Sequence, residues 1–249
     1  MSHLERLAAA QREEFLRRGG ALPARAVPVR PFPLRRDGPP ALIAEFKRSS
    51  PSYGAFPAPD RTEQLRRYAE IGAAAVSVLV AGEGFGGDIA DLQAARDETQ
   101  LPLLYKGFVS LRAQIDEAYA YGADAVLLIA ALLGPQLPDF LSYAQERGLA
   151  ALCEVHDAGE LRAAAEAGAR FLGVNNRDLR TLEVDTGRFI ELAAQADESV
   201  LLVAESGYRT RRAVLEAVRA GARGVLVGEA LLAGSELQVP WDEVLSHVG

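Results

Sequence analysis

Short runs of apolar residues alternate with longer stretches rich in alanine, glutamate and arginine from residue 41 onward. Each apolar run has the length and the near-continuous hydrophobicity of a strand that is buried on both faces. The runs predict eight strands, near residues 41–47, 74–80, 101–106, 124–130, 149–155, 170–175, 199–205 and 223–228. The stretches between and after them predict eight helices, near residues 61–71, 88–98, 111–121, 136–147, 158–167, 186–196, 210–220 and 240–247.

Glycines mark the points where predicted helices end and the next strands begin. They occur in Gly72-Ala73, Gly122-Ala123, Gly148-Leu149, Gly168-Ala169 and Gly221-Ala222. The spacing of about 25 residues, or twice that, is typical of a repeated strand–helix unit. Eight such units close a parallel barrel, so we predict an α/β protein with a single (β/α)8 TIM barrel and an N-terminal helical extension. An open doubly wound sheet is the alternative, and the lack of Gly-x-Gly-x-x-Gly after the first strand disfavours it.

The first forty residues follow a different pattern. Residues 3–18 predict an amphipathic helix with one stripe formed by Leu4, Leu7, Ala8, Gln11 and Phe15. Gly19-Gly20 ends this helix, and residues 23–40 contain six prolines, which predicts an extended connector. We therefore expect residues 1–40 to pack on a catalytic barrel of residues 41–249, and residues 3–40 to cover part of its mouth.

Composition and charge exclude several classes of protein. The net charge of −7 argues against nonspecific binding to nucleic acid, and no apolar run is long enough to span a bilayer. The single cysteine excludes an internal disulfide, and the three scattered histidines form no zinc motif. We predict a cytoplasmic protein that binds neither nucleic acid nor membrane and acts on a small anionic molecule.

Charged residues stand at the ends of the predicted strands. In the first strand Ile43, Glu45 and Lys47 share one face, and a structural ion pair is the plain alternative for that strand taken alone. Later strands end in Lys106, Glu154, Asn175 with Arg177, and Glu205. Because the carboxyl ends of barrel strands meet at one mouth, we expect these charges to form a functional site.

The remaining strands and loops predict the character of the ligand. The second and fourth strands carry no charge, and Phe85 and Phe108 lie in loops beside the mouth. Ser206-Gly207 and Gly228-Glu229 follow the seventh and eighth strands, where such barrels bind phosphate through backbone N–H groups. These features favour a ligand with a flat apolar part and anionic parts.

Five motifs resemble the indole-3-glycerol phosphate synthase family of tryptophan biosynthesis over residues 3–247. They are Ile-Ala-Glu45-Phe-Lys47-Arg-Ser-Ser-Pro-Ser, Cys-Glu154-Val-His, Gly-Val-Asn175-Asn176-Arg177-Asp-Leu, Glu205-Ser206-Gly207 and Val-Gly228-Glu229-Ala-Leu. The resemblance implies a carboxy-lyase acting on 1-(2-carboxyphenylamino)-1-deoxyribulose 5-phosphate, a sugar phosphate that carries an anthranilate group. It implies ring closure with loss of CO₂ and water, no metal or organic cofactor, and a monomer or weak homodimer.

The resemblance also implies a role for each matching residue. Lys106 is the expected general acid, with neighbouring cations expected to lower its pKa, and Glu154 is the expected acid/base of dehydration. Catalysis is expected to involve Glu45, Lys47 and Asn175 as well. The expected substrate-binding residues are Ser50, Phe85, Phe108, Arg177, Leu179, Glu205 and Ser206. The expected phosphate-binding residues are Gly207, Gly228 and Glu229.

Three positions depart from the pattern of the family. The usual block Arg-Lys-Asp-Phe reads Tyr105-Lys106-Gly107-Phe108 here, and Val80 replaces a common threonine. These changes keep the lysine but remove the charges beside it, so a binding barrel with little catalysis is one alternative. Phosphoribosylanthranilate isomerase, a barrel enzyme expected to use a Cys/Asp pair, is the other, with Cys153 as its only possible thiol.

Overall fold

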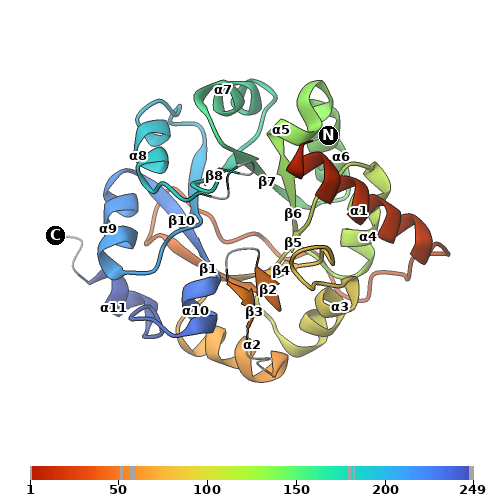
Figure 1. The fold of residues 1–249 in the computed structure, drawn as a ribbon, viewed down its shortest axis with the longest axis horizontal. Helices are drawn as coiled ribbons and strands as arrows, with labels where there is room; N and C mark the ends of the chain where they lie inside the picture. The colour runs from red at the N-terminus through yellow and green to blue at the C-terminus, as the bar shows by residue number, and fades with distance from the viewer. Residues whose placement is uncertain (1, 51–52, 57–59, 179–180, 182, 247–249) are drawn as a thin grey trace.

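Eight parallel strands form a closed barrel in the computed structural model, which describes residues 2–50, 53–56, 60–178, 181 and 183–246 (Figure 1). The order around the barrel is β1-β10-β9-β8-β7-β6-β5-β4, and β4 pairs with β1 to close it. The strands are β1 (Ala41–Phe46), β4 (Ala75–Leu79), β5 (Leu103–Lys106), β6 (Ala125–Ile129), β7 (Ala150–Val155), β8 (Phe171–Asn175), β9 (Leu201–Glu205) and β10 (Ala222–Val227). Each predicted strand is confirmed to within two residues at either end.

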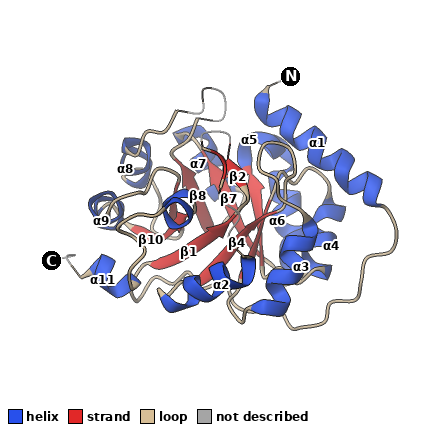
Figure 2. Ribbon diagram, turned by 60° about the horizontal axis from the view of Figure 1, so that its bottom comes forward, coloured by secondary structure: helices blue, strands red, loops and turns tan. Residues whose placement is uncertain are grey.

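Helices surround the strands, as Figure 2 shows. Those predicted from the sequence are α1 (His3–Arg18), α2 (Arg61–Glu70), α3 (Ile89–Glu98), α4 (Arg112–Ala120), α6 (Leu137–Glu146), α7 (Ala158–Glu166), α8 (Gly187–Ala193), α9 (Arg211–Arg219) and α11 (Trp241–Leu245). The predicted (β/α)8 TIM barrel with an N-terminal helix is therefore confirmed.

Short elements in the loops were not predicted. They are the β2–β3 hairpin (Ser49–Ser50 and Gly54–Ala55), α5 (Ala130–Leu133), a 3-10 turn (Gly134–Gln136) and α10 (Glu229–Ala233). Elements of two to five residues span too little chain for a hydrophobic period to show. The hairpin matters for the site because it follows β1 and places Ser50 in a buried position beside the mouth.

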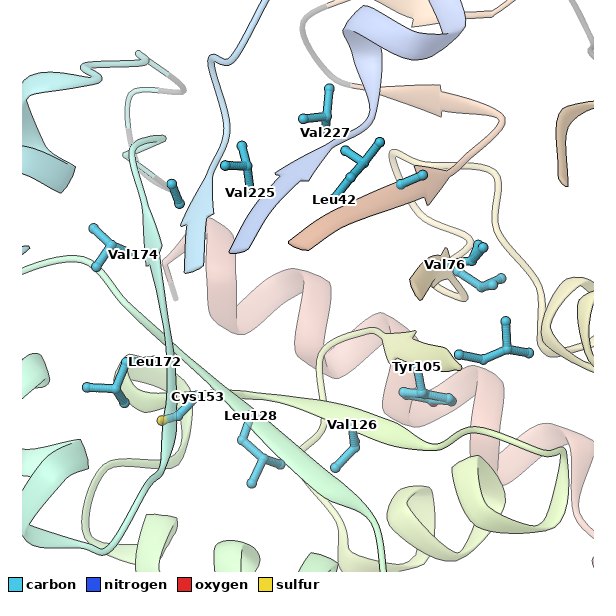
Figure 3. Packing of buried hydrophobic residues seen from close by; sticks show 14 of the residues in the cluster. Leu42, Val76, Tyr105, Val126, Leu128, Cys153, Leu172, Val174, Val225 and Val227 are labelled. Carbon is cyan, nitrogen blue, oxygen red and sulfur yellow. The ribbon is translucent and has the colours of Figure 1, made fainter. Parts of the chain in front are cut away.

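Alternating side chains of the strands build two layers of core. Leu42, Val76, Tyr105 and Val126 point outward and pack under the helices (Figure 3). Ile43 and Leu104 point inward and join the apolar filling of the barrel. The face assignment predicted for the first strand is confirmed, since Leu42, Ala44 and Phe46 belong to the outer layer.

The N-terminal segment reaches both ends of the barrel. Helix α1 packs beside the carboxyl ends of the strands, where His3 and Leu7 line a cavity. The connector crosses the opposite end: Phe32 lies 6.3 Å from Phe171 at the start of β8, ring centre to ring centre, and Leu34 packs over Gly224. The expectation that residues 3–40 cover the mouth was therefore wrong for residues 23–40, whose apolar side chains fill the base.

Buried charges tie the connector to this base. Asp124 is fully buried just before β6 and accepts hydrogen bonds from the Arg25 guanidinium at 3.0 Å and the Arg30 backbone N–H at 2.8 Å. Its other oxygen accepts from Arg96 and from the Leu103 backbone, each at 2.9 Å. Complete hydrogen bonding of this kind makes a buried carboxylate tolerable.

Candidate active site

A cavity of about 560 Å³ opens at the carboxyl ends of the strands. All but one of the site residues predicted from the sequence line it. They are Glu45, Lys47, Ser50, Phe85, Lys106, Phe108, Glu154, Asn175, Arg177, Glu205, Ser206, Gly207, Gly228 and Glu229. The exception, Leu179, lies outside the described residues.

Lys106 stands among three carboxylates that come from three other strands. Its Nζ lies 2.8 Å from Oε2 of Glu205, 3.6 Å from Oε2 of Glu154 and 3.9 Å from Oε2 of Glu45. Burial by itself lowers the pKa of Lys106, but the three carboxylates raise it above the ordinary value of a lysine. The expectation that nearby cations lower this pKa was wrong. The side chain of Lys106 is instead a protonated ammonium in the site.

Glu45 forms a second ion pair at the end of β1. Lys47 donates to its Oε1 at 2.6 Å, and the buried Tyr68 hydroxyl donates to its backbone carbonyl at 2.8 Å. Burial raises the pKa of Glu45, but Lys47 and Lys106 lower it below the ordinary value. A Cβ on Gly228 would lie 2.5 Å from Oε1 of Glu45, so the glycine leaves room for this carboxylate.

Glu205 lies in a buried and crowded position at the end of β9. Only 1% of the residue is exposed, and burial raises the pKa of Glu205 to about 7 although Lys106 opposes the shift. Repulsion from Glu154 and Glu45 acts in the same direction as burial. Of the three carboxyl groups around Lys106, Glu205 is the one that holds a proton most readily near neutral pH.

Glu154 has the opposite electrostatic environment. Burial raises its pKa, but His156, Lys106 and the hydrogen-bonding Asn175 amide together hold the pKa of Glu154 well below the ordinary value. The Oδ1 of Asn175 accepts from the Ser206 hydroxyl at 2.8 Å and from the Arg177 backbone at 3.0 Å. These two bonds orient the amide so that its NH₂ group donates to the Glu154 carboxylate.

Asn176 fixes the loop beyond β9. This fully buried side chain donates to the Ser206 carbonyl and to the Tyr208 hydroxyl, both at 3.0 Å, and accepts from the Phe189 backbone at 3.0 Å. Ser206 has a φ of 63°, in the left-handed region that few residues other than glycine adopt. Asn176 therefore supports a strained serine at the rim of the cavity.

Part of the cavity wall is apolar, as predicted from the uncharged strands. Leu79, Leu127 and Ile129 line it, and the rings of Phe85 and Phe108 lie 6.0 Å apart. The cavity therefore combines an aromatic wall, formed by Phe85 and Phe108, with the charged groups. This combination fits a ligand with a flat apolar part.

Several lining residues were missed from the sequence. They include His3, Leu7, Tyr53, Val184 and Arg209. The guanidinium of Arg209 pairs with Glu229, and its place shortly after Ser206-Gly207 was a usable signal. The scarcity of lysine was a second signal for site residues. Of the 27 lysines and arginines in the sequence, only Lys47 and Lys106 are lysines, and both line the cavity.

Comparison with known proteins gives the family. The model of the family described as indole-3-glycerol phosphate synthase matches residues 24–243. The chain belongs to the indole-3-glycerol phosphate synthase family.

Relatives agree with this assignment, and solved structures agree with the fold. Indole-3-glycerol phosphate synthases of Bacillus cereus and Bacillus anthracis are 45% and 44% identical to the chain over 205 residues, which cover 81% of each protein. Thiamine phosphate pyrophosphorylase from Pyrococcus furiosus superposes with a TM-score of 0.61 at 17% identity, covering 84% of this chain and 95% of its own. N-acetylmannosamine-6-phosphate 2-epimerase from Clostridium perfringens superposes with a TM-score of 0.60 at 14% sequence identity. The match covers 83% of this chain and 90% of the epimerase. These two structures share the fold.

Departures from the indole-3-glycerol phosphate synthase pattern cluster against helix α1. Gln11, 2% exposed, donates to the Tyr105 hydroxyl at 2.9 Å and accepts from the Phe108 backbone N–H at 2.5 Å. A Cβ on Gly107 would overlap the Gln11 amide and lie 3.0 Å from Val80. Tyr105 and Gly107 thus form the surface on which Gln11 docks, and Val80 lies next to Gly107, so the three family departures gather at one place.

Two further properties concern only the described part of the chain. No helix there is long and apolar enough to cross a membrane. No group of three or more histidine, cysteine, aspartate or glutamate side chains in the same residues is arranged to hold a metal ion.

Proposed function

We propose that this cavity converts 1-(2-carboxyphenylamino)-1-deoxyribulose 5-phosphate into indole-3-glycerol phosphate, CO₂ and water. The observation that supports this most directly is an ammonium, Lys106, held by three carboxylates in a cavity that Phe85 and Phe108 also line. The phenyl ring of the substrate fits beside Phe85 and Phe108. Its anionic groups fit beside Lys47, Arg177 and Arg209.

Lys106 acts as the general acid of ring closure in this proposal. As the aromatic carbon attacks the ketone carbon, the ketone oxygen gains negative charge and takes a proton from the ammonium. Positioned charge in a water-poor site stabilises such an oxyanion strongly. Loss of CO₂ then returns two electrons to the ring and restores its aromaticity.

Glu154 acts in dehydration, with support from its neighbours. A proton delivered through Glu154 converts the leaving hydroxyl into water, and Asn175 orients this carboxyl group. The carbon beside the ring nitrogen gives its proton to the Glu45 carboxylate, from which Lys106, 3.9 Å away, regains the proton that it donated. Lys47 and Glu45, paired at 2.6 Å, assist at the adjoining strand end. Two carboxyl groups in different environments can take different acid–base roles.

The remaining residues bind and orient the substrate. We assign this role to Ser50, Phe85, Phe108, Arg177, Leu179, Glu205 and Ser206. We assign the phosphate to the ends of β9 and β10, where Gly207, Gly228 and Glu229 line the cavity together with Arg209. Gly207 has a φ of 88°, a backbone conformation that brings an N–H toward a ligand at little steric cost.

The isomerase alternative conflicts with the position of Cys153. This thiol belongs to the outer layer of the core, and burial raises the pKa of Cys153 to about 12. It therefore points away from the mouth and stays protonated at neutral pH, so it cannot act as a base there.

Incubating the purified protein with the carboxyphenylamino substrate tests the proposal. Fluorescence and absorbance of an indole product should appear, with one CO₂ released for each indole formed. Binding of the substrate without turnover would instead identify a binding barrel. We also propose that residues 41–249 form a catalytic domain on which residues 1–40 pack, that the protein is cytoplasmic, and that it is a monomer or weak homodimer.

A further inference from the structure

The proposed reaction consumes one proton in each turnover. One proton goes to the ketone oxygen and one goes to the leaving hydroxyl, whereas only one is returned, from the carbon beside the ring nitrogen. Loss of CO₂ from a carboxylate releases electrons to the ring and no proton. A buried site that performs this chemistry therefore needs a route by which a proton enters from solvent.

His156 lies between a buried carboxylate of the site and a carboxylate nearer the surface. Its Nε2 is 3.3 Å from Oε1 of Glu154, and its Nδ1 is 3.1 Å from Oε2 of Glu160 in the first turn of α7. The exposed fractions of the side chains rise along this chain, from 3% for Glu154 through 14% for His156 to 22% for Glu160. The three groups thus lead outward from the cavity.

Both ring nitrogens of His156 face carboxylate oxygens, so both are placed to donate. Nδ1 is held, because Oε2 of Glu160 also accepts from the His156 backbone N–H at 2.8 Å. Nε2 is buried and has no aligned hydrogen bond among the described residues, although Glu154 is 3.3 Å away. A small movement of either side chain would complete the contact, so this N–H is placed for transfer to Glu154.

The charges around His156 favour its protonated form. Burial lowers the pKa of His156, but Glu154 and Glu160 outweigh it and raise this pKa to about 10. The neighbouring elements β6, β8 and α5 contain no titratable side chain, and Lys106 of β5 lies on the far side of Glu154. His156 is therefore an imidazolium at neutral pH, and one of its protons lies within reach of the Glu154 carboxylate.

We propose that His156 and Glu160 carry the consumed proton from solvent to Glu154. Nε2 of the imidazolium gives its proton to the Glu154 carboxylate, which passes it to the leaving hydroxyl so that water departs. The neutral imidazole that remains carries its proton on Nδ1. This proton moves to Nε2 by tautomerisation through solvent, and Nδ1 then takes up the replacement proton from Glu160, whose carboxyl group exchanges with solvent. His156 acts through Glu154 and does not itself contact the substrate, and the inference rests on the proposed reaction.

Replacing His156 with residues that do not relay a proton tests this route. His156→Gln keeps amide donors but cannot exchange a proton, so kcat should fall about tenfold or more, within the usual range for acid–base groups, with little change in KM. His156→Ala should regain activity when imidazole is added, increasingly as the imidazolium fraction rises. Glu160→Gln should lower kcat less, whereas Glu166→Gln, on the exposed face of the same helix, should change nothing.

Three results would overturn the proposal. They are an unchanged kcat in His156→Gln, a loss in His156→Ala that imidazole does not relieve, and equal effects of the Glu160 and Glu166 substitutions. Loss without rescue would mean that His156 only supports the shape of the loop. If the His156 variants fail to fold, as judged by circular dichroism, the Glu160→Gln comparison decides alone. Wild-type protein in the same assay separates these outcomes from failure of the proposed reaction, which would show no indole product at all.

Discussion

Gly173 on β8 has no side chain at the place where the carboxyl oxygen Oε1 of Glu205 lies. A Cβ at this position would overlap that oxygen. The two residues sit on neighbouring strands, with Gly173 paired to Val203 two residues before Glu205. The absence of one methyl group therefore decides where a carboxylate that contacts Lys106 can be placed.

Gly173→Ala should displace Glu205 and lower kcat while the barrel stays folded. Glu205→Asp shortens the acid by one methylene and should make room for the new methyl group. The double variant should therefore lose less activity than the two single losses predict, because neighbouring substitutions are not additive. Strict additivity in kcat, measured for all four proteins, would show that the two side chains do not compete for this space.

Lys106→Met should lower kcat at least about a hundredfold, the low end for a general acid. Methionine keeps much of the length and the apolar stem of lysine but cannot donate a proton. Substrate binding should persist, because the aromatic wall and the arginines are untouched. Single-turnover rates together with a binding isotherm separate the two effects, and a near-normal kcat would remove Lys106 from the chemistry.

Glu205 should make the stability of the protein depend on pH in a defined window. Its pKa rises from the ordinary 4.5 to about 7 on folding, so the folded protein holds this proton more tightly than the unfolded chain. The stabilisation from this group is complete below pH 4.5 and is lost as the pH rises through 7. Glu205→Gln should abolish this part of the loss of stability with rising pH. Denaturant titrations of both proteins at several pH values measure the free energy of unfolding. If this free energy changed with pH in parallel in the two proteins, the raised pKa of Glu205 would be contradicted.

Gln11→Ala should loosen helix α1 and the end of β5 together. It removes the bonds to Tyr105 and to the Phe108 backbone, so the free energy of unfolding should fall by about 1–3 kcal/mol. KM should rise as well, because Phe108 and Leu7 line the cavity. Arg12→Ala, at an exposed position next in the same helix, is the matched control and should change neither quantity. Equal effects of the two substitutions would show that the contacts of Gln11 with Tyr105 and Phe108 are not specific.

Asp124→Asn should separate stability from activity. It keeps the shape of the side chain but leaves Arg25 and Arg96, 4% and 5% exposed, without their buried counter-charge. Breaking such a pair costs about 3–5 kcal/mol. Because this cluster lies at the base of the barrel, kcat of the folded protein should stay close to normal. Thermal unfolding and steady-state kinetics on one preparation check both statements. A loss of kcat without a loss of stability would contradict the prediction, because it would show that the charges at the base affect catalysis at the mouth.

The sequence determined which residues could meet at the mouth. Glu154 follows a run of apolar residues, and Lys106 ends another such run, so each had to stand at the carboxyl end of a buried strand. In a parallel barrel all these ends meet on one side, which makes the membership of the site predictable before any distance is known. The apolar wall followed from the same pattern, since the second and fourth strands carry no charge.

The tertiary structure alone decided which of these residues touch. Lys106 lies closest to Glu205, 99 positions away in the chain, and the room for that contact comes from Gly173 on a third segment. The docking of Gln11 and the closure of the base by Leu34 likewise join distant segments. Periodicity reports the burial of a residue relative to its own strand or helix. Distances across the barrel depend on the stagger of eight strands and on the side-chain volumes of their neighbours, which no local pattern records.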